Sequence, residues 1–225
     1  MSAFNISIIV PIYNEAAQAS ALALTLRQLK DEWVEEIILV DGGSDDGGAE
    51  QLAKEFTVLQ GPKGRGAQMN MGANQATGAW LLFLHADTSL GSSHLKEAMS
   101  QGALHHWGRF NVRLNGQHFM FPVIAWFMNM RSRLTGIATG DQCIFVRKKL
   151  FNELGGFADI ALMEDVELCK RLKKHHKPIC LSKAVTTSSR RWREFGVYKT
   201  IWLMWKLRFY FWRGASAAKL AQLYR

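Results

Sequence analysis

The sequence is poor in cysteine, in proline and in residues that promote disorder. Three cysteines among 225 residues, without a Cys-x-x-Cys spacing, exclude a fully paired disulfide framework and favour a reduced, cytosolic protein. Four prolines and 19 glycines leave no collagen-like or low-complexity tract. A chain of this length, of which 48% is hydrophobic, can bury a core without disulfide or metal cross-links.

The sequence also lacks the segments that typically export a chain or anchor it in a membrane. Residues 1–5 lead directly into a β-branched stretch, without the basic start and long apolar run of a signal peptide. The longest nearly uncharged apolar stretch, residues 119–130, is shorter than the roughly 18 residues that a membrane-spanning helix needs. We therefore expect a cytoplasmic protein without a single-pass anchor.

Positive charge is concentrated at the C-terminal end. The chain carries 28 lysines and arginines against 19 acidic residues, and from residue 188 onward it has nine basic residues and one acidic residue. The tail therefore carries a net charge of +8, whereas residues 1–187 are close to neutral. Such asymmetry indicates an anionic partner for the tail, which can be phosphate, nucleic acid or acidic lipid.

The first half of the chain alternates short β-branched runs with longer helix-compatible segments. Strands are expected at residues 6–12, 36–40 and 80–84. The helical segments between them are expected at residues 16–30, 47–55 and 66–76. This order predicts an α/β fold with a mostly parallel sheet flanked by helices, because crossover helices join parallel strands.

Polar residues follow each of these strands, at the edge where parallel sheets bind ligands. The segments are residues 11–15, 41–47 and 85–88. A basic glycine-rich loop, residues 61–66, adds a weak phosphate-binding signal before a helix, although it lacks the ending of a P-loop. We expect these segments to meet at one crevice.

Taken singly, the polar residues also have structural explanations. Asp41 fits a turn, His85 fits a hydrogen-bonded structural histidine, and Asp87 fits the cap of a helix that begins near Ser92. Their joint placement at one sheet edge favours a binding site.

Further motifs complete a pattern that runs along most of the chain. In order, the segments are residues 7–15, 38–45, 64–70, 82–87, Gly140-Asp141, 155–157 and 164–165. Together they resemble the family-2 inverting glycosyltransferases of the GT-A fold, in their small bacterial single-domain form. The resemblance covers residues 5–195. It implies a Rossmann-like GT-A catalytic domain at residues 1–195, followed by a basic aromatic helical appendage at residues 196–225.

The resemblance assigns roles to individual residues of this chain. The donor would be a nucleoside diphosphate sugar. The residues on the nucleotide side would be Pro11, Tyr13, Glu15, Asp41, Arg65, His85 and Arg191. Asp87 would hold a divalent cation, Mg²⁺ or Mn²⁺, that bridges the diphosphate. Asp165 would be the catalytic base, and the residues on the acceptor side would be Asp141, Glu164 and Trp192.

The chemistry of inverting transfer explains these residue types. The acceptor hydroxyl must give its proton to a carboxylate as it attacks the anomeric carbon, while the departing diphosphate needs positive charge. Val166 and Cys169 follow Asp165 at helical spacing, which predicts that Asp165 lies at the start of a helix. Glu164 and Glu167 fit equally well as residues that complement a helix N-terminus.

Three positions differ from the family's pattern. The Asp-x-Asp motif reads His85-Ala86-Asp87, so an imidazole replaces one carboxylate. Gly42 stands where many relatives carry a second acidic residue, which leaves the nucleobase open between UDP and GDP. The Gln-x-x-Arg-Trp motif of processive relatives appears at residues 188–192 without its glutamine. This last difference predicts a non-processive enzyme that transfers one sugar.

The tail combines aromatic and basic residues at helical spacing. Basic residues recur every seven positions at Lys199, Lys206 and Arg213. Aromatic residues recur at alternating spacings of four and three, at Tyr198, Trp202, Trp205, Phe209 and Trp212.

This pattern leaves two interpretations of the tail open. One is an interfacial helix on the inner face of the plasma membrane, which brings the enzyme to a lipid-linked acceptor. The other is a core helix that closes the acceptor side, and residues 119–130 fit either.

Two further function classes each fit part of the sequence. An RNA-binding protein would use the tail's aromatics for stacking and its arginines for phosphate, but it would leave the other motifs unused. A sugar-phosphate nucleotidyltransferase has a similar sheet, but the N-terminal segment lacks its glycine-rich, arginine-containing signature. We therefore expect an unknown hydroxyl acceptor, lipid-linked in the interfacial interpretation of the tail, and no nucleic-acid partner.

Overall fold

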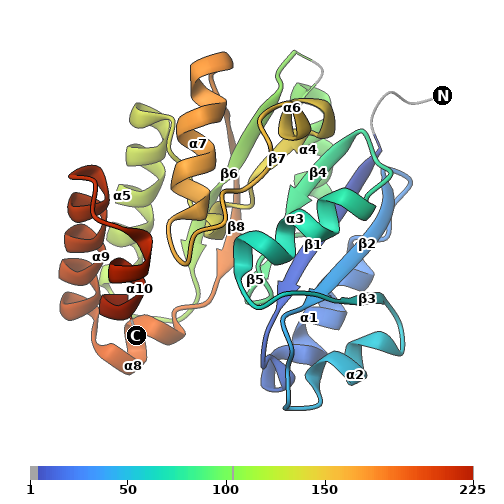
Figure 1. Cartoon of the computed structure of the whole chain (residues 1–225), viewed down its shortest axis with the longest axis horizontal. Coiled ribbons are helices and arrows are strands. Elements are labelled where there is room, and N and C mark those ends of the chain that lie inside the picture. The colour runs from blue at the N-terminus through green and yellow to red at the C-terminus, as the bar shows by residue number, and fades with distance from the viewer. Residues whose placement is uncertain (1–4, 103, 225) are drawn as a thin grey trace.

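A computed structural model describes residues 5–102 and 104–224 (Figure 1). The prediction that the chain has no signal peptide rests on residues 1–5, of which only Asn5 lies inside these ranges. Arg225 of the basic tail lies outside them. The described chain forms one eight-stranded sheet covered by helices on both faces, with the strand order β3-β2-β1-β4-β7-β6-β8-β5. The predicted α/β architecture is confirmed.

The N-terminal half is the parallel part of the sheet. Its elements are β1 (Ile6–Ile12), α1 (Ala16–Gln28), β2 (Val34–Asp41), α2 (Gly48–Ala53), β3 (Thr57–Gln60), α3 (Arg65–Gln75) and β4 (Trp80–Phe83). Strands β3, β2, β1 and β4 pair in parallel. The predicted strands and helices are confirmed with small shifts in their bounds. β3 is an addition, because this four-residue edge strand is half exposed and carries no continuous apolar run.

The second half closes the sheet with a mixed arrangement. Its elements are β5 (Thr88–Ser89), α4 (Ser92–Gly102), β6 (Trp107–Leu114), α5 (Met120–Thr135), the 3-10 turn η1 (Gly140–Gln142), β7 (Phe145–Arg147), α6 (Lys148–Glu153), α7 (Glu164–His175), β8 (Ile179–Thr187), α8 (Arg190–Phe195), α9 (Val197–Trp212) and α10 (Ala217–Tyr224). β6 and β8 are parallel, whereas β7 and β5 run antiparallel to their neighbours. The sheet is therefore mostly parallel.

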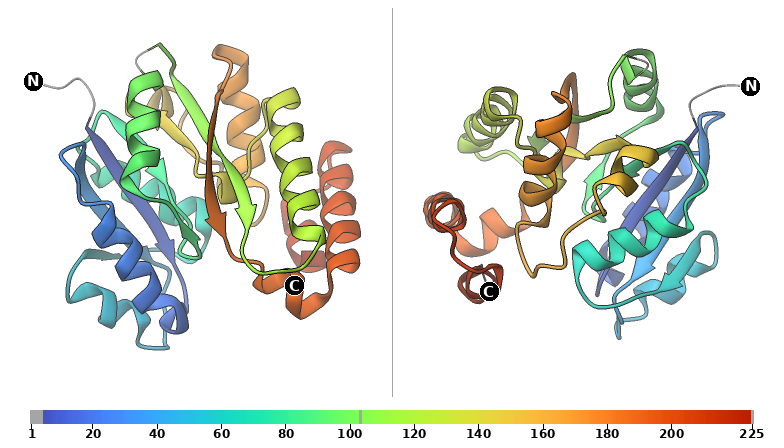
Figure 2. Two further views of the ribbon diagram at one scale, coloured as in Figure 1. Left: turned by 180° about the vertical axis from the view of Figure 1, so that it is seen from behind. Right: turned by 45° about the horizontal axis from the view of Figure 1, so that its top comes forward.

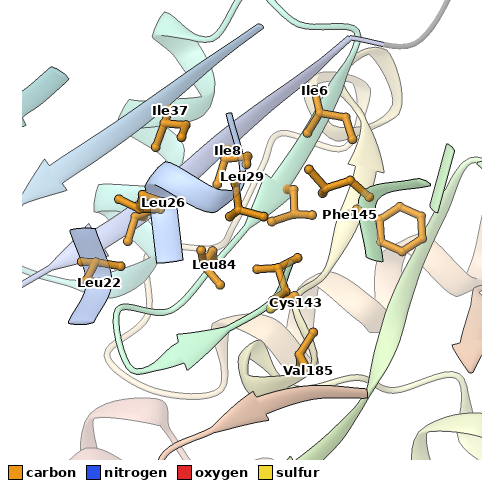
Figure 3. Close-up of a cluster of buried hydrophobic side chains, with 14 of the residues drawn as sticks. Ile6, Ile8, Leu22, Leu26, Leu29, Ile37, Leu84, Cys143, Phe145 and Val185 are labelled. Carbon is orange, nitrogen blue, oxygen red and sulfur yellow. The ribbon is translucent and has the colours of Figure 1, made fainter. Parts of the chain in front are cut away.

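The core lies in two layers, one on each face of the sheet. β1 is buried along its whole length, and its side chains alternate between the layers because successive residues of a strand point to opposite faces. Ile8 packs with Leu22 and Leu26 of α1 on one face (Figure 3), whereas Ile9 packs with Phe83 on the other. A strand buried on both faces cannot shift its register without exposing apolar side chains, so its polar end is held in place.

The C-terminal helices pack against the second half of the sheet. Phe121 and Ile124 of α5 form a buried cluster with Val197 of α9. A second cluster joins Leu207 of α9 to Leu220 of α10 and to the residues at the start of α7. The predicted helix in the tail is confirmed, and one of its faces is buried. Within residues 5–102 and 104–224, no helix has both the length and the hydropathy needed to cross a bilayer.

Candidate functional site

A cavity of about 340 Å³ opens at the carboxyl ends of β1 and β4. Its walls come from the loops after these strands, from η1, and from the beginnings of α3, α7 and α8, with α9 along one side. Of the twelve predicted site residues, ten line it: Pro11, Glu15, Arg65, His85, Asp87, Asp141, Glu164, Asp165, Arg191 and Trp192. The structure thus brings together side chains that are far apart in the sequence.

Three of these side chains form a group suited to a divalent cation. His85, Asp87 and Asp141 each offer a ligand atom, and these atoms lie within 4.8 Å of one another. Two carboxylates and an imidazole are a chemically reasonable donor set for Mn²⁺ or Mg²⁺. The sequence had assigned the metal to Asp87 alone, because nothing in the spacing indicates that the turn at Asp141 folds back onto it.

The close approach of η1 to the loop after β4 depends on a glycine. A Cβ atom at Gly140 would lie 2.1 Å from Cε1 of His85, so any side chain there would displace the imidazole. His85 Nδ1 lies 3.6 Å from Oδ1 of Asp141. Burial alone would raise the pKa of Asp141, but the neighbouring His85, with Arg65 and Arg208, lowers it below its usual value. Asp141 is therefore ionised at neutral pH.

Asp165 lies at the start of α7, as its spacing predicted. Its Oδ2 accepts a hydrogen bond of 2.8 Å from the backbone N–H of Gly140, and its Oδ1 accepts one of 2.6 Å from the N–H of Val166. The N-terminus of a helix also favours negative charge. These contacts fix the carboxylate in the same cavity as the group of His85, Asp87 and Asp141.

The residue before α7 has an unusual backbone. Met163 has a φ of +69°, in the left-handed region, which costs a non-glycine residue roughly 1–2 kcal/mol. Its buried side chain packs with Val166, Leu207 and Leu220, and this packing offsets the cost. The turn sets the direction in which Glu164 and Asp165 enter the cavity, and no sequence signal indicated it.

α3 supplies the opposite wall. Its first residue, Arg65, lies 3.6 Å from the buried carboxylate of Glu164. Burial, followed by the charge of Asp165, raises the pKa of Glu164, and Arg65 opposes this effect. Asn70 holds α3 in place, because its side chain exchanges two hydrogen bonds of 2.8 Å with the backbone of Phe157.

Arginines from the C-terminal helices reach the same cavity. Arg190 lies 4.0 Å from Glu15, whose pKa is raised, mainly by burial. Arg191 stacks on the ring of Tyr224 at 3.7 Å and donates a hydrogen bond to the backbone carbonyl of that residue. Tyr224 thereby joins the lining of the cavity.

Two further arginines near Asp165 were not singled out from the sequence. Arg208 of α9 lines the cavity, and Arg131 of α5 is near enough to feel the charges of Arg208 and Asp165. Burial, followed by repulsion from Arg208, lowers the pKa of Arg131 to about 10, and Asp165 acts in the opposite direction. In the sequence Arg208 is one residue of a basic tail and Arg131 is the residue after an apolar segment, and the direction of both side chains depends on how α5 and α9 pack.

Tyr13 and Asp41 lie outside the lining of this cavity. Tyr13 is exposed, and the ammonium of Lys63 donates to its hydroxyl at 2.7 Å. Asp41 is buried and accepts hydrogen bonds from the backbone N–H and the hydroxyl of Ser44. Ser44 in turn accepts a hydrogen bond from the N–H of Asn14. The loops after β1 and β2 are therefore joined, and the nucleotide-binding roles of Tyr13 and Asp41 stay predictions.

Two solved structures illustrate the similarity in fold. Staphylococcus aureus TarS, residues 1–349 in complex with UDP-GlcNAc, matches with a TM-score of 0.66 and 19% identity, over 82% of this chain and 58% of that one. The mannosyltransferase PcManGT from Pyrobaculum calidifontis, in complex with GDP-Man and Mn²⁺, matches with a TM-score of 0.63 and 18% identity, over 81% of this chain and 56% of that one. At these identities the likeness shows the fold, which is GT-A.

Curated relatives match a shorter part of the chain. Glycosyltransferase AglE of Haloferax volcanii is 30% identical over 105 residues, which cover 42% of this chain and 34% of the relative. A PGL/p-HBAD biosynthesis glycosyltransferase of Mycobacterium tuberculosis is 40% identical over 100 residues, which cover 40% of this chain and 38% of the relative. The chain thus matches little more than a third of the length of these relatives.

The family model described as glycosyl transferase family 2 matches residues 7–155. This range includes the predicted motifs from β1 to η1 and covers more than half of the chain. Together with the fold, it shows that the chain belongs to glycosyl transferase family 2.

Proposed function

We propose that this protein is a non-processive, inverting glycosyltransferase that moves one sugar from a nucleoside diphosphate sugar to a hydroxyl acceptor. One observation carries the proposal. The carboxylate of Asp165, held by the N–H of Gly140, lies in the same cavity as the group of His85, Asp87 and Asp141. A candidate base and a candidate site for the diphosphate would therefore share one cavity.

In this proposal Asp165 is the catalytic base. As the acceptor oxygen bonds to the anomeric carbon, its proton passes to Asp165, and the bond from that carbon to the diphosphate oxygen breaks with its electron pair. Attack from the face opposite the leaving group inverts the configuration. Glu164 is less suited to this role, because its carboxylate is buried against the guanidinium of Arg65.

The donor diphosphate is assigned to the part of the cavity that holds His85, Asp87 and Asp141. His85, Asp87 and Asp141 would hold Mg²⁺ or Mn²⁺, which supplies positive charge to the leaving diphosphate when bound. Arg65 and Arg191 add charge from the protein itself. The nucleotide would extend from Pro11 and Glu15 toward Tyr13 and Asp41. TarS and PcManGT are named as complexes with UDP-GlcNAc and GDP-Man, which supports a donor that carries either uracil or guanine as its nucleobase.

The acceptor side is formed by Glu164 and Trp192, next to α9. We propose a division in which residues 1–195 carry out the transfer and residues 196–225 form a helical appendage that closes this side. All three cysteines are free, which agrees with the proposed cytoplasmic location.

The test is a screen of UDP- and GDP-sugars with and without Mn²⁺, in which release of the nucleoside diphosphate is measured. We expect Asp165→Asn to lower turnover by roughly 10²–10⁴-fold, the usual contribution of a general base, while the donor still raises the melting temperature. Asp159→Asn, an exposed acid outside the cavity lining, is the matched control and should leave turnover unchanged.

Two outcomes would overturn the proposal. If Asp165→Asn turned over the donor as fast as the control variant, the base would lie elsewhere. Release of pyrophosphate in place of a nucleoside diphosphate would identify a nucleotidyltransferase.

A further inference from the structure

Large apolar side chains exposed to solvent gather on two helices. In the described part of the chain, eleven of the sixteen such residues belong to α5, its N-cap and α9. They are Phe119, Val123, Trp126, Phe127, Leu134, Tyr198, Trp202, Trp205, Phe209, Tyr210 and Trp212. We refer to these eleven residues as the aromatic face. Soluble proteins rarely expose an apolar patch of this kind unless it binds a partner.

The two helices are neighbours. Buried contacts of Phe121 and Ile124 with Val197 and Ile201 join α5 to α9. Figures 1 and 2 show both helices along the same edge of the molecule, at the end of the sheet far from β2 and β3. Their exposed sides therefore contribute to one surface at this edge.

On α9 the exposed and buried sides are clearly separated. Trp202, Trp205 and Trp212 are 64%, 68% and 74% exposed, whereas Val197 and Leu207 are buried. The sequence alone left this division unclear, because apolar residues occur all around the helix. Packing against the rest of the protein buries Val197 and Leu207 and leaves the three tryptophans in solvent.

The charges on these two helices indicate what kind of partner the aromatic face binds. Neither α5 nor α9 contains an acidic residue, whereas Lys199, Lys206 and Arg213 run beside the aromatic stripe of α9 at intervals of seven. Lys206 lies over the ring of Trp202 at 4.7 Å. Tryptophan and tyrosine beside lysine and arginine are the residues that proteins place at the level of anionic lipid headgroups.

We propose that the aromatic face docks the enzyme on a bilayer that contains anionic lipid. Since no helix of the described residues can cross a membrane, α5 and α9 would lie in the interface with their aromatic side chains inserted. Val123 and Leu134 of this face are aliphatic and offer no ring on which a nucleic-acid base could stack, whereas aliphatic and aromatic side chains both insert into lipid.

The same helix connects this surface to the cavity. Thr200, Met204 and Arg208, on the other side of α9, line the cavity close to Asp165. The bilayer would thus lie about one helix diameter, roughly 10 Å, from the acceptor side. This arrangement suits a hydroxyl carried by a lipid, and this part of the inference rests on the proposed function.

Vesicle flotation tests the docking without any substrate. We expect the full chain to float with vesicles of phosphatidylglycerol and phosphatidylcholine at low salt, and to float much less at high salt or with phosphatidylcholine alone. The double variant Trp202→Ala/Trp205→Ala should lower the partition coefficient by about ten-fold or more, because two rings that would otherwise be inserted are removed. Leu24→Ala, an exposed apolar residue on α1, is the control and should float like the unchanged protein.

A charge variant tests the electrostatic part. Lys199→Gln/Lys206→Gln should weaken flotation and reduce its salt dependence, whereas the exposed pair Lys54→Gln/Lys174→Gln should not. Circular dichroism and unchanged hydrolysis of a soluble donor show that each variant is folded.

Three results would overturn the docking proposal. They are failure of the unchanged protein to float at low salt, equal flotation of the tryptophan variant, and a dimer in solution that dissociates when Trp202 and Trp205 are replaced. Asp165→Asn should float normally, so loss of the transferase proposal and loss of the docking proposal can be told apart.

Discussion

A methyl group at Gly140 would collide with the imidazole of His85. The added Cβ would lie 2.1 Å from Cε1 and 2.2 Å from Nε2, where contacts below 3.0 Å are essentially never found, so the ring or the turn must move by about 1 Å. This shift would separate His85 from Asp141 and disturb the hydrogen bond from Gly140 to Asp165. A displacement of that size in a site that positions reactants costs roughly 100-fold in rate, or about 2.7 kcal/mol in transition-state free energy.

The assay compares Gly140→Ala with the unchanged protein in nucleoside diphosphate release and in the rise of melting temperature caused by Mn²⁺. We expect kcat/KM to fall by roughly 100-fold and the response to Mn²⁺ to shrink, with the circular dichroism spectrum unchanged. Gly91→Ala is the matched control, because a Cβ at Gly91 meets nothing within 4 Å. If Gly140→Ala kept both the turnover and the Mn²⁺ response of the control, the geometry assigned to the site would be wrong.

Two further predictions concern other parts of the chain. Burial would raise the pKa of Glu36, but hydrogen bonds from Thr77 and neighbouring donors lower it below its ordinary 4.5. Near pH 4.5 and below, the unfolded state therefore binds more protons than the folded state, and the free energy of unfolding falls as the pH drops. Glu36→Gln should lower the free energy of unfolding, measured by urea denaturation at neutral pH, by about 1–2 kcal/mol. The difference between the variant and the unchanged protein should shrink below pH 4.5, and a difference that stays the same at acid pH would refute the stabilising role given to the Glu36 carboxylate. Burial raises the pKa of Cys143 and Cys169, whereas Cys180 is partly exposed, so a disulfide reagent should label at most one thiol in the native protein and three in urea. Rapid labelling of two or more thiols in the native state would show that the core is not packed as described.

Most of the fold could be predicted because its strands are buried on both faces. Ile6–Ile12 and Trp80–Phe83 read as continuous apolar runs, and glycine and polar residues mark where each run ends. β3 and β5 could not be predicted in this way, since short strands at or near an edge are held by their neighbours' hydrogen bonds and not by their own hydrophobicity. The antiparallel direction of β7 likewise depends on its pairing with β4 and β6.

The candidate site also has a part that the sequence predicts and a part that it does not. The residues that follow strands, such as His85 and Asp87, could be placed at one sheet edge from the chain order alone. The approach of Asp141 to them, and of Arg208 to Asp165, could not be foreseen, because it depends on the turn at Gly140 and on how α9 packs. No local spacing encodes a contact between side chains that belong to different layers.

The sequence by itself determined the glycosyltransferase family and the mostly parallel sheet, and it indicated the candidate carboxylates, because strand burial, turn residues and motif order can be read along the chain. Tertiary structure alone decided which of those carboxylates share a cation-sized space, and which side of α9 faces solvent. The physical reason is that α9 is apolar all around, so that only its contacts with α5, α7 and α10 determine which side chains are buried and which remain exposed.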